Sequence, residues 1–189
     1  MNKNLFLLII ISLFFSCTED PTQPKPKAYL SLTYEEASYT LFNEDCPYQF
    51  LMNDEAIVQP SKNNRECWVN IKYPNKKATI FITYNKVDNN LEELLKDAQK
   101  LPLQHSVKAD EIEASLFKNK LKKTFGTLYE VKGDAASQAQ FYTTDSLSHF
   151  LTGAIYFDAK PNYDSILPAA EYIKNDIRKL MESLEWVKN

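Results

Sequence analysis

The segment CWVNIKYPNKKATIFITY, residues 67–84, alternates apolar and polar side chains on both sides of a short polar break. Before the break, every second residue from Cys67 to Tyr73 is apolar or aromatic, and the same holds from Ala78 to Tyr84. A period of two is the pattern of a half-buried β-strand, and Pro74–Lys77 suits a turn. The segment therefore predicts an antiparallel β-hairpin.

Shorter strand patterns lie on both sides of this hairpin. Upstream, Tyr48–Met52 and Ala56–Gln59 predict a second hairpin, with Asp54 in its turn. Downstream, β character returns after a helical segment, with a turn at Gly133–Asp134. The strands predicted there are Ile112–Phe117, Lys122–Val131, Ala136–Thr143 and Phe150–Phe157.

A first amphipathic helix is predicted after the long hairpin. Asn90 is expected to begin it, because Asn90 and Glu93 have the spacing of a capping box. Pro102 is expected to end it, since proline removes a helical hydrogen bond. Its apolar stripe consists of Leu91, Leu94, Leu95, Ala98 and Leu101.

The last part of the chain predicts a second, longer helix. Asp164 or Ser165 is expected to cap it, and Pro168 is expected in its first turn. The stripe has heptad-like spacing, but the segment contains only about three heptads. A stripe of this length favours packing on a sheet over a coiled coil. The stripe consists of Ile166, Ala170, Ile173, Ile177, Leu180, Leu184 and Val187.

This order of strands, helix, strands and helix, with hairpin-length connections, predicts the α+β class. We expect a mainly antiparallel sheet covered by two main helices. The pattern shows no internal repeat, and residues 28–189 are long enough for one domain with its own core. The sequence therefore predicts a single α+β domain over residues 28–189.

The start of the chain has the composition of an export signal. Lys3 precedes an apolar run, Leu5–Phe15, and small Ser16 precedes Cys17. The run is too short to span a bilayer, which takes about 20 residues, so a membrane-spanning anchor is disfavoured. A buried apolar helix is the other alternative. The stretch resembles a bacterial lipoprotein signal over residues 1–16, in which the cysteine thiol is acylated, although bulky Phe14 departs from that pattern.

Residues 17–27 form a proline-rich segment without apolar periodicity. We interpret it as an extended tether that separates the folded domain from the lipid at Cys17. Glu19–Asp20 resembles a surface-export signal of some gliding-bacterium lipoproteins, or is simply solvated tether. The formal net charge of −3 argues against nucleic acid as a partner, because nucleic-acid binding needs a basic face.

Cys46 and Cys67 remain once Cys17 is assigned to the lipid. Export places them in an oxidising compartment, where two thiols usually pair, so a disulfide is expected. Such a bridge would stabilise the fold by about 3 kcal/mol. Metal ligation and a reactive thiol are the alternatives, and neither cysteine has a CxxC partner or a nearby histidine.

The sequence contains little that indicates catalysis. The two histidines, His105 and His149, have no metal-ligand spacing, and the three glycines form no phosphate-binding loop, so no metal, cofactor or small-molecule substrate is expected. Asp145, Ser146 and Ser148 beside His149 suggest either a proton relay or, more simply, a turn.

Two other polar runs remain open between a structural and a functional interpretation. Asp110, Glu111 and Glu113 are candidate acid/base carboxylates or cation ligands, but the run looks solvated. Gly133–Gln138 suits a tight turn entering a strand, or a protein contact that needs close backbone approach. The sequence does not separate these alternatives.

Several strings resemble the GldD family of gliding-motility lipoproteins, over nearly the whole chain after Cys17. They continue through the last helix to Trp186. The matching strings are DCPY (45–48), KATI (77–80), NL (90–91) with LLKDAQKL (94–101), HFLTG (149–153) and KPNYDSILPAA (160–170).

The resemblance implies a lipid-anchored cell-envelope protein, expected in the outer membrane and required for gliding and the linked type IX secretion machinery. It implies a role in the assembly or stability of other lipoproteins, notably GldJ. It brings no catalytic residues; Cys17, Cys46 and Cys67 match family features. The alternative function is an envelope enzyme or chaperone, acting on peptidoglycan or exported proteins through Asp110 and Glu113. The fold is also similar, more loosely, to a PsbP/Mog1-type sandwich.

Overall fold

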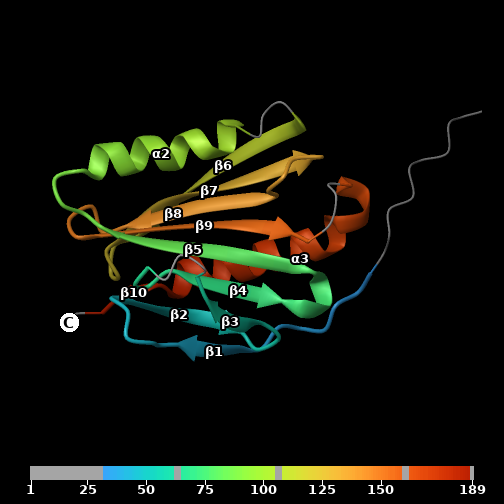
Figure 1. Ribbon diagram of the computed structural model, residues 1–189, viewed down its shortest axis with the longest axis horizontal. Coiled ribbons are helices and arrows are strands. Elements are labelled where there is room, and N and C mark those ends of the chain that lie inside the picture. The colour runs from blue at the N-terminus through green and yellow to red at the C-terminus, as the bar shows by residue number, and fades with distance from the viewer. Residues whose placement is uncertain (1–31, 62–64, 105–107, 159–161, 188–189) are drawn as a thin grey trace, which may run out of the picture.

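The computed structural model describes residues 32–61, 65–104, 108–158 and 162–187, so the predicted signal, the tether and Cys17 lie outside them. Within these residues the chain forms a seven-stranded antiparallel sheet, a three-stranded antiparallel sheet and two α-helices (Figure 1). This confirms the predicted α+β class. The elements are β1 Tyr39–Phe42, β2 Tyr48–Asn53, β3 Ile57–Pro60, β4 Val69–Tyr73, β5 Ala78–Lys86, α2 Leu91–Gln104, β6 Ala109–Asn119, β7 Thr124–Gly133, β8 Ala139–Thr144, β9 His149–Phe157, α3 Tyr163–Ser183 and β10 Glu185–Trp186.

The hairpin predicted from residues 67–84 is confirmed as β4 and β5. A short 3₁₀ turn at Pro74–Lys76 connects them, and Ile71 lies opposite Ile80 across the pair. β5 pairs with β9 along its whole length. The hairpin therefore supplies the second and third strands of the large sheet, whose strand order is β3-β4-β5-β9-β8-β7-β6. The four strands predicted downstream are confirmed as β6 to β9, with ends shifted by up to three residues.

The predicted hairpin of Tyr48–Met52 and Ala56–Gln59 is wrong. β2 pairs with β1 and β10 in the small sheet, whereas β3 pairs with β4 in the large one. Asn53 explains the separation: its carbonyl accepts a bond from the Ala56 amide in a tight turn, while its side chain donates to Asp176 of α3. The chain therefore leaves one sheet at Asn53 and enters the other.

α2 begins as predicted after Asn90 but does not end at Pro102. The Asn90 carbonyl accepts the first helical bond from Leu94, whereas its side chain accepts from the Asp88 amide, so it does not form the expected capping box. Pro102 is buried inside the helix, which continues to Gln104. Pro102 lacks the N–H that would bond to the Ala98 carbonyl, but burial of its ring compensates for this loss, so the helix continues for two more residues.

α3 uses the predicted apolar stripe, but both of its ends differ from the prediction. Asn162, rather than Asp164 or Ser165, occupies the cap position, without a side-chain bond, and Pro168 lies in the second turn. The helix ends at Ser183, so Val187 follows β10 and is not part of the stripe. The fully or nearly fully buried members of the stripe are Ala170, Ile173, Ile177, Leu180 and Leu184.

The two faces of the large sheet bury separate hydrophobic clusters. One cluster joins α3 and the small sheet to the inner face, with Ile80 and Phe50 among its fully buried members. The other lies under α2, around Ala98, Tyr142 and Phe150. Figure 1 shows α2 on one side of the sheet and α3 behind it. None of the helices in the described residues is long and apolar enough to cross a bilayer.

Candidate functional site

Two neighbouring hollows lie at the end of the molecule where the β6–β7 and β8–β9 turns meet the C-terminal strand. Their volumes are about 590 Å³ and about 620 Å³, and both are lined by Ser148, His149 and Val187. In Figure 1 this end lies to the left, beside the C-terminus. Polar and aromatic side chains from distant parts of the chain meet at this end, which makes it the candidate site.

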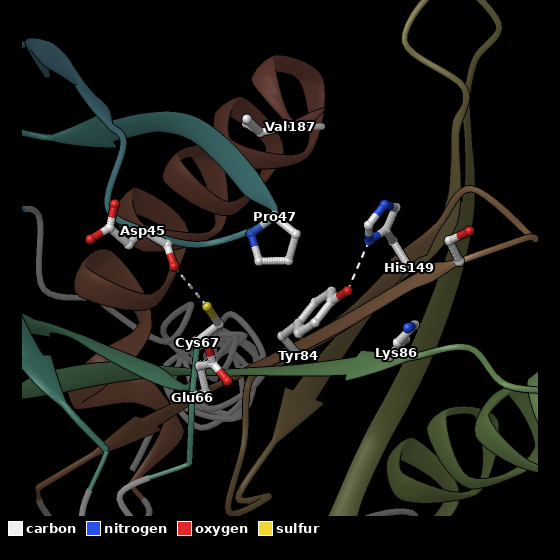
Figure 2. Close-up of a pocket in the computed structure, with 9 residues that line it drawn as sticks. Asp45, Pro47, Glu66, Cys67, Tyr84, Lys86, His149 and Val187 are labelled. Carbon is white, nitrogen blue, oxygen red and sulfur yellow. Dashed lines mark hydrogen bonds between the residues drawn. The ribbon is translucent and has the colours of Figure 1, made fainter. Parts of the chain in front are cut away.

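His149 lies between the two hollows and is held on two sides. Its Nδ1 lies 2.8 Å from the Tyr84 hydroxyl, a contact that Figure 2 shows at the mouth of the first hollow. Its ring stacks on Trp186, with centroids 5.0 Å apart and planes at 11°. Trp186 in turn donates its indole N–H to the carbonyl of Lys123 at 3.3 Å. β5, β9, β10 and the β6–β7 turn together position this histidine.

Burial sets the protonation of this pair. Burial lowers the pKa of His149 and outweighs the opposing effect of the Asp145 carboxylate. Burial, aided by Asp145, raises the pKa of Tyr84. Tyr84 is therefore protonated and His149 neutral near pH 7, so the hydroxyl donates to Nδ1. The second ring nitrogen, which points away from Tyr84 in Figure 2, then carries the proton.

The polar run from Asp145 to His149 is a turn, as the simpler interpretation predicted. One carboxylate oxygen of Asp145 accepts the backbone N–H groups of Leu147, Ser148 and His149 at 2.8–2.9 Å. Burial alone would raise the pKa of Asp145, but these three donors hold the pKa below its usual value. The carboxylate is thus engaged by the backbone and does not orient His149 through a ring nitrogen.

A disulfide joins Cys46 to Cys67 at the wall of the first hollow, with Cα atoms 5.5 Å apart. Cys46 precedes β2 of the small sheet and Cys67 precedes β4 of the large sheet, so the bridge links the two sheets. The Tyr48 hydroxyl reinforces this link by donating to the Cys67 carbonyl at 2.8 Å. The rim beside it carries the exposed acids Asp45 and Glu66 (Figure 2).

The other candidate carboxylates lie elsewhere. Asp110, Glu111 and Glu113 are exposed on the edge strand β6, and Glu111 pairs with Lys132 at 2.8 Å. None of the three lines either hollow. The solvated interpretation of this run is confirmed. His105 and Cys17 lie outside the described residues.

Gly133–Gln138 forms the tight turn between β7 and β8. Gly133 has φ +101°, where a side chain would be strained, and an added Cβ would lie 2.7 Å from the Asp110 amide nitrogen. Gln138 is buried and donates to the Ala135 carbonyl at 2.9 Å. Ser137 is fully buried, so the run serves the turn rather than an open contact surface.

The sequence patterns did not predict a buried polar network around Asp176. Asp176 accepts bonds from Tyr39 at 2.7 Å and Asn53 at 2.9 Å, and burial raises its pKa. Nearby, the Lys76 ammonium lies 4.1 Å from the centroid of the Tyr172 ring and pairs with Glu55. The network joins the small sheet, α3 and the β4–β5 turn, and its role is structural. The only sequence signal was a charge directly beside the apolar stripe.

No group of three or more His, Cys, Asp and Glu suited to holding a metal ion occurs in the part of the chain that the structure describes. The side chains that line the two hollows are apolar, aromatic, basic and acidic, and they come from segments far apart in the sequence.

Comparison with protein families decides what kind of protein carries this site. The profile of the family described as "gliding motility lipoprotein GldD" matches residues 19–186, from the tether to the tryptophan that stacks on His149. The chain belongs to this family. No curated protein matches the chain.

Membership of the GldD family gives the protein a role in gliding motility and a membrane-anchored location in the cell envelope. The GldD family is not a known enzyme family. The matched range includes both disulfide cysteines and every residue of the candidate site up to Trp186. The sequence did not identify Tyr84 and Trp186 as site residues. Tyr84 fits the alternation of a packed strand, and Trp186 fits the end of the predicted last helix.

Proposed function

We propose that this protein is a non-enzymatic envelope lipoprotein that supports the assembly or stability of partner lipoproteins in the gliding apparatus and the linked type IX secretion machinery. A GldJ-type lipoprotein is the partner proposed first, and the outer membrane is the proposed location. The observation that carries the proposal is the family match over residues 19–186.

The proposal includes the layout of the chain. Residues 1–16 are removed as a signal, Cys17 is acylated, residues 17–27 are the tether, and residues 28–189 are the folded domain. A Pro-rich tether of about ten residues reaches at most about 30 Å from the lipid. The domain is thereby kept close to the bilayer while its surface stays accessible to other proteins.

The polar groups of the domain support a binding role over a catalytic one. His149 is neutral and engaged by Tyr84, Asp145 is engaged by three backbone N–H groups, and Asp110 and Glu113 are exposed on an edge strand. A general acid or base needs a pKa tuned by burial or by a close charge, in a cavity that excludes water. The carboxylates of the enzyme alternative have no such environment.

Deletion of the gene tests the proposal. The deletion strain should lose gliding and type IX secretion, and the full-length gene supplied in trans should restore both. Spreading on agar and the secreted protein profile are the measurements. A deletion strain that glides and secretes normally would remove the proposed function.

The same strain decides between the binding and the enzyme alternatives. A gene with Asp110→Asn and Glu113→Gln should restore motility as well as the unaltered gene does, because both side chains are exposed and remote from the hollows. Loss of motility at normal protein abundance would favour the envelope enzyme.

A further inference from the structure

We propose that the second hollow, here called the hairpin cleft and formed by Leu121, Lys123, Leu147, His149 and Trp186, docks an extended acidic segment with apolar side chains from a partner envelope protein. The inference rests on the proposed function and adds where the partner binds and what chemistry it presents.

The rim of the hairpin cleft is unusually apolar for a solvent-exposed end of a molecule. Leu121 at the β6–β7 turn is 97% exposed and Leu147 at the β8–β9 turn is 74% exposed. Both are large apolar side chains on the tips of hairpins, and both line the same hollow of about 620 Å³. Exposed apolar side chains that gather around a concavity mark an interaction site rather than scattered surface.

The floor of the cleft is rigid. Trp186 is fixed by its indole N–H bond to Lys123 and by its stack on His149, which Tyr84 holds from the other side. Preformed aromatic surfaces bind with little loss of conformational entropy, and tryptophan is frequent among the residues that dominate binding energy. An apolar side chain inserted between the two leucines would rest on this floor.

The charge around the cleft selects an acidic partner. Lys122 and Lys123 line the cleft, and Lys118 and Lys120 precede them in the same β6–β7 hairpin, although the whole chain has a net charge of −3. Lys122 is used internally, since it pairs with Glu185 at 3.1 Å and donates to the Ser183 carbonyl at 3.1 Å. Asp145, the other acid that lines the cleft, keeps its negative charge, and one of its oxygens accepts three backbone N–H groups of its own turn. The four lysines of the β6–β7 hairpin therefore outnumber the two acids of the cleft. Within the described residues, no ion pair is found for Lys120 or Lys123, so their charge is available to a partner.

Two observations favour a protein segment over a lipid surface. The leucines border a hollow of about 620 Å³, and a concavity of this kind accommodates the inserted side chains of a partner segment. In addition, the described chain enters β1 from the right of Figure 1, while the hairpin tips lie at the left. The hairpin tips that carry the cleft therefore lie at the end of the domain away from residue 32, where the described chain begins.

A binding measurement with a defined probe tests the inference. The probe is a fluorescein-labelled peptide in which glutamates flank leucines, titrated with the mature lipidated protein in detergent micelles. We expect saturable binding whose Kd rises roughly tenfold or more in the double variant Leu121→Ser/Lys123→Glu. Both side chains are exposed, so the variant should fold normally, which its thermal unfolding would verify.

The matched control is Lys100→Glu/Leu103→Ser on α2, which exchanges the same residue types at exposed positions outside the hairpin cleft and should leave the Kd unchanged. A peptide with lysines in place of the glutamates should not bind. The inference is overturned if the two peptides bind equally, if no binding occurs, or if the control variant loses as much affinity. Competition by mixed micelles that contain phosphatidylglycerol, but not by those that contain phosphatidylcholine, would assign the cleft to a membrane instead if it is lost in the Leu121→Ser/Lys123→Glu variant.

A complementation arm separates this inference from the proposed function. In the deletion strain, the Leu121→Ser/Lys123→Glu gene should fail to restore gliding at normal protein abundance, whereas the α2 control should restore it. If deletion has no phenotype, the proposed function fails. If deletion abolishes gliding but the cleft variant restores it fully, the docking site is wrong and the proposed function stands.

Discussion

His149 shows how much one residue at the candidate site depends on its neighbours. It is half-buried, bonded to Tyr84 and stacked on Trp186, and burial lowers its pKa. The neutral ring is an acceptor at Nδ1, and protonation would turn that acceptor into a donor facing a hydroxyl that already donates. Folding is therefore coupled to the charge of this ring.

This coupling predicts a pH dependence of stability. The pKa of His149 is lower in the folded chain than the 6.5 of an unfolded one, so the unfolded chain binds more protons below that value. Stability should be complete above pH 6.5 and should fall as the pH drops toward the folded pKa. The free energy of unfolding in urea, at about pH 7.5 and about pH 5.5, measures the fall. In the His149→Phe variant, the loss of stability between these two pH values should be smaller. An equal loss in that variant would contradict the assignment of the pH dependence to His149.

Gly126 illustrates a second residue-scale constraint, because β7 passes very close to β8 there. An added Cβ would lie 1.9 Å from the Tyr142 carbonyl oxygen, so the backbone itself would have to shift. We expect Gly126→Ala to lower the free energy of unfolding by about 3 kcal/mol. Urea denaturation measures the loss, with exposed Ser115→Ala on β6 as a control expected within about 0.5 kcal/mol. A loss at Gly126 no larger than at the control would show that the strands are less closely packed.

At the scale of elements, the disulfide connects two sheets that share no strand. Cys46 lies in the loop between β1 and β2 of the small sheet, and Cys67 lies just before β4 of the large sheet. We expect Cys46→Ser/Cys67→Ser to lose about 3 kcal/mol of stability, chiefly because the unfolded chain gains freedom. Urea unfolding measures the loss, and mass spectrometry of unreduced peptides should find the two cysteines joined. Free thiols at both positions in the purified protein would contradict the bridge.

The elements also show what the sequence could predict and what it could not. Alternation predicted β4 and β5, and the apolar stripe predicted α3, since these patterns depend only on burial of one face. The pairing of β2 was missed because it depends on Asn53, whose buried amide bonds to a helix more than a hundred residues later. The end of α2 was missed because burial of Pro102 overrides its local effect.

The candidate site was less predictable than the fold. The turn at Asp145 could be predicted from its local composition, because it depends only on neighbouring residues. One carboxylate oxygen accepts the backbone N–H groups of three residues that follow it. The meeting of Tyr84, His149 and Trp186 could not be predicted, since it depends on the register of β5 with β9 and on the late strand β10. Neither alternation nor helical spacing contains that information.

At the scale of the whole molecule, anchor and domain have separate tasks. We predict that Cys17→Ala abolishes incorporation of radiolabelled palmitate and removes the protein from the membrane fraction, because the thiol is the proposed site of acylation. The Cys46→Ser/Cys67→Ser variant is the matched control and should keep the label. A Cys17→Ala protein that still carries palmitate would exclude Cys17 as the lipid site.

The domain itself has an asymmetric layout that suits a connecting role. The described chain enters β1 at one end, and the β6–β7 and β8–β9 turns lie at the other (Figure 1). These two turns carry the exposed leucines of the hairpin cleft. Two clusters on opposite faces of the large sheet, with a disulfide between the sheets, keep these ends in a fixed relation. A rigid body of this kind can hold a partner at a defined position above the membrane.

The lifetime of GldJ in cells is the decisive measurement for the proposed stabilisation of partner lipoproteins. After protein synthesis is stopped, GldJ should disappear severalfold faster in cells that lack this protein than in cells that have it, at equal GldJ transcript levels. Supplying the full-length gene should restore the slower rate. Equal GldJ lifetimes with and without this protein would contradict the claim that it stabilises partner lipoproteins.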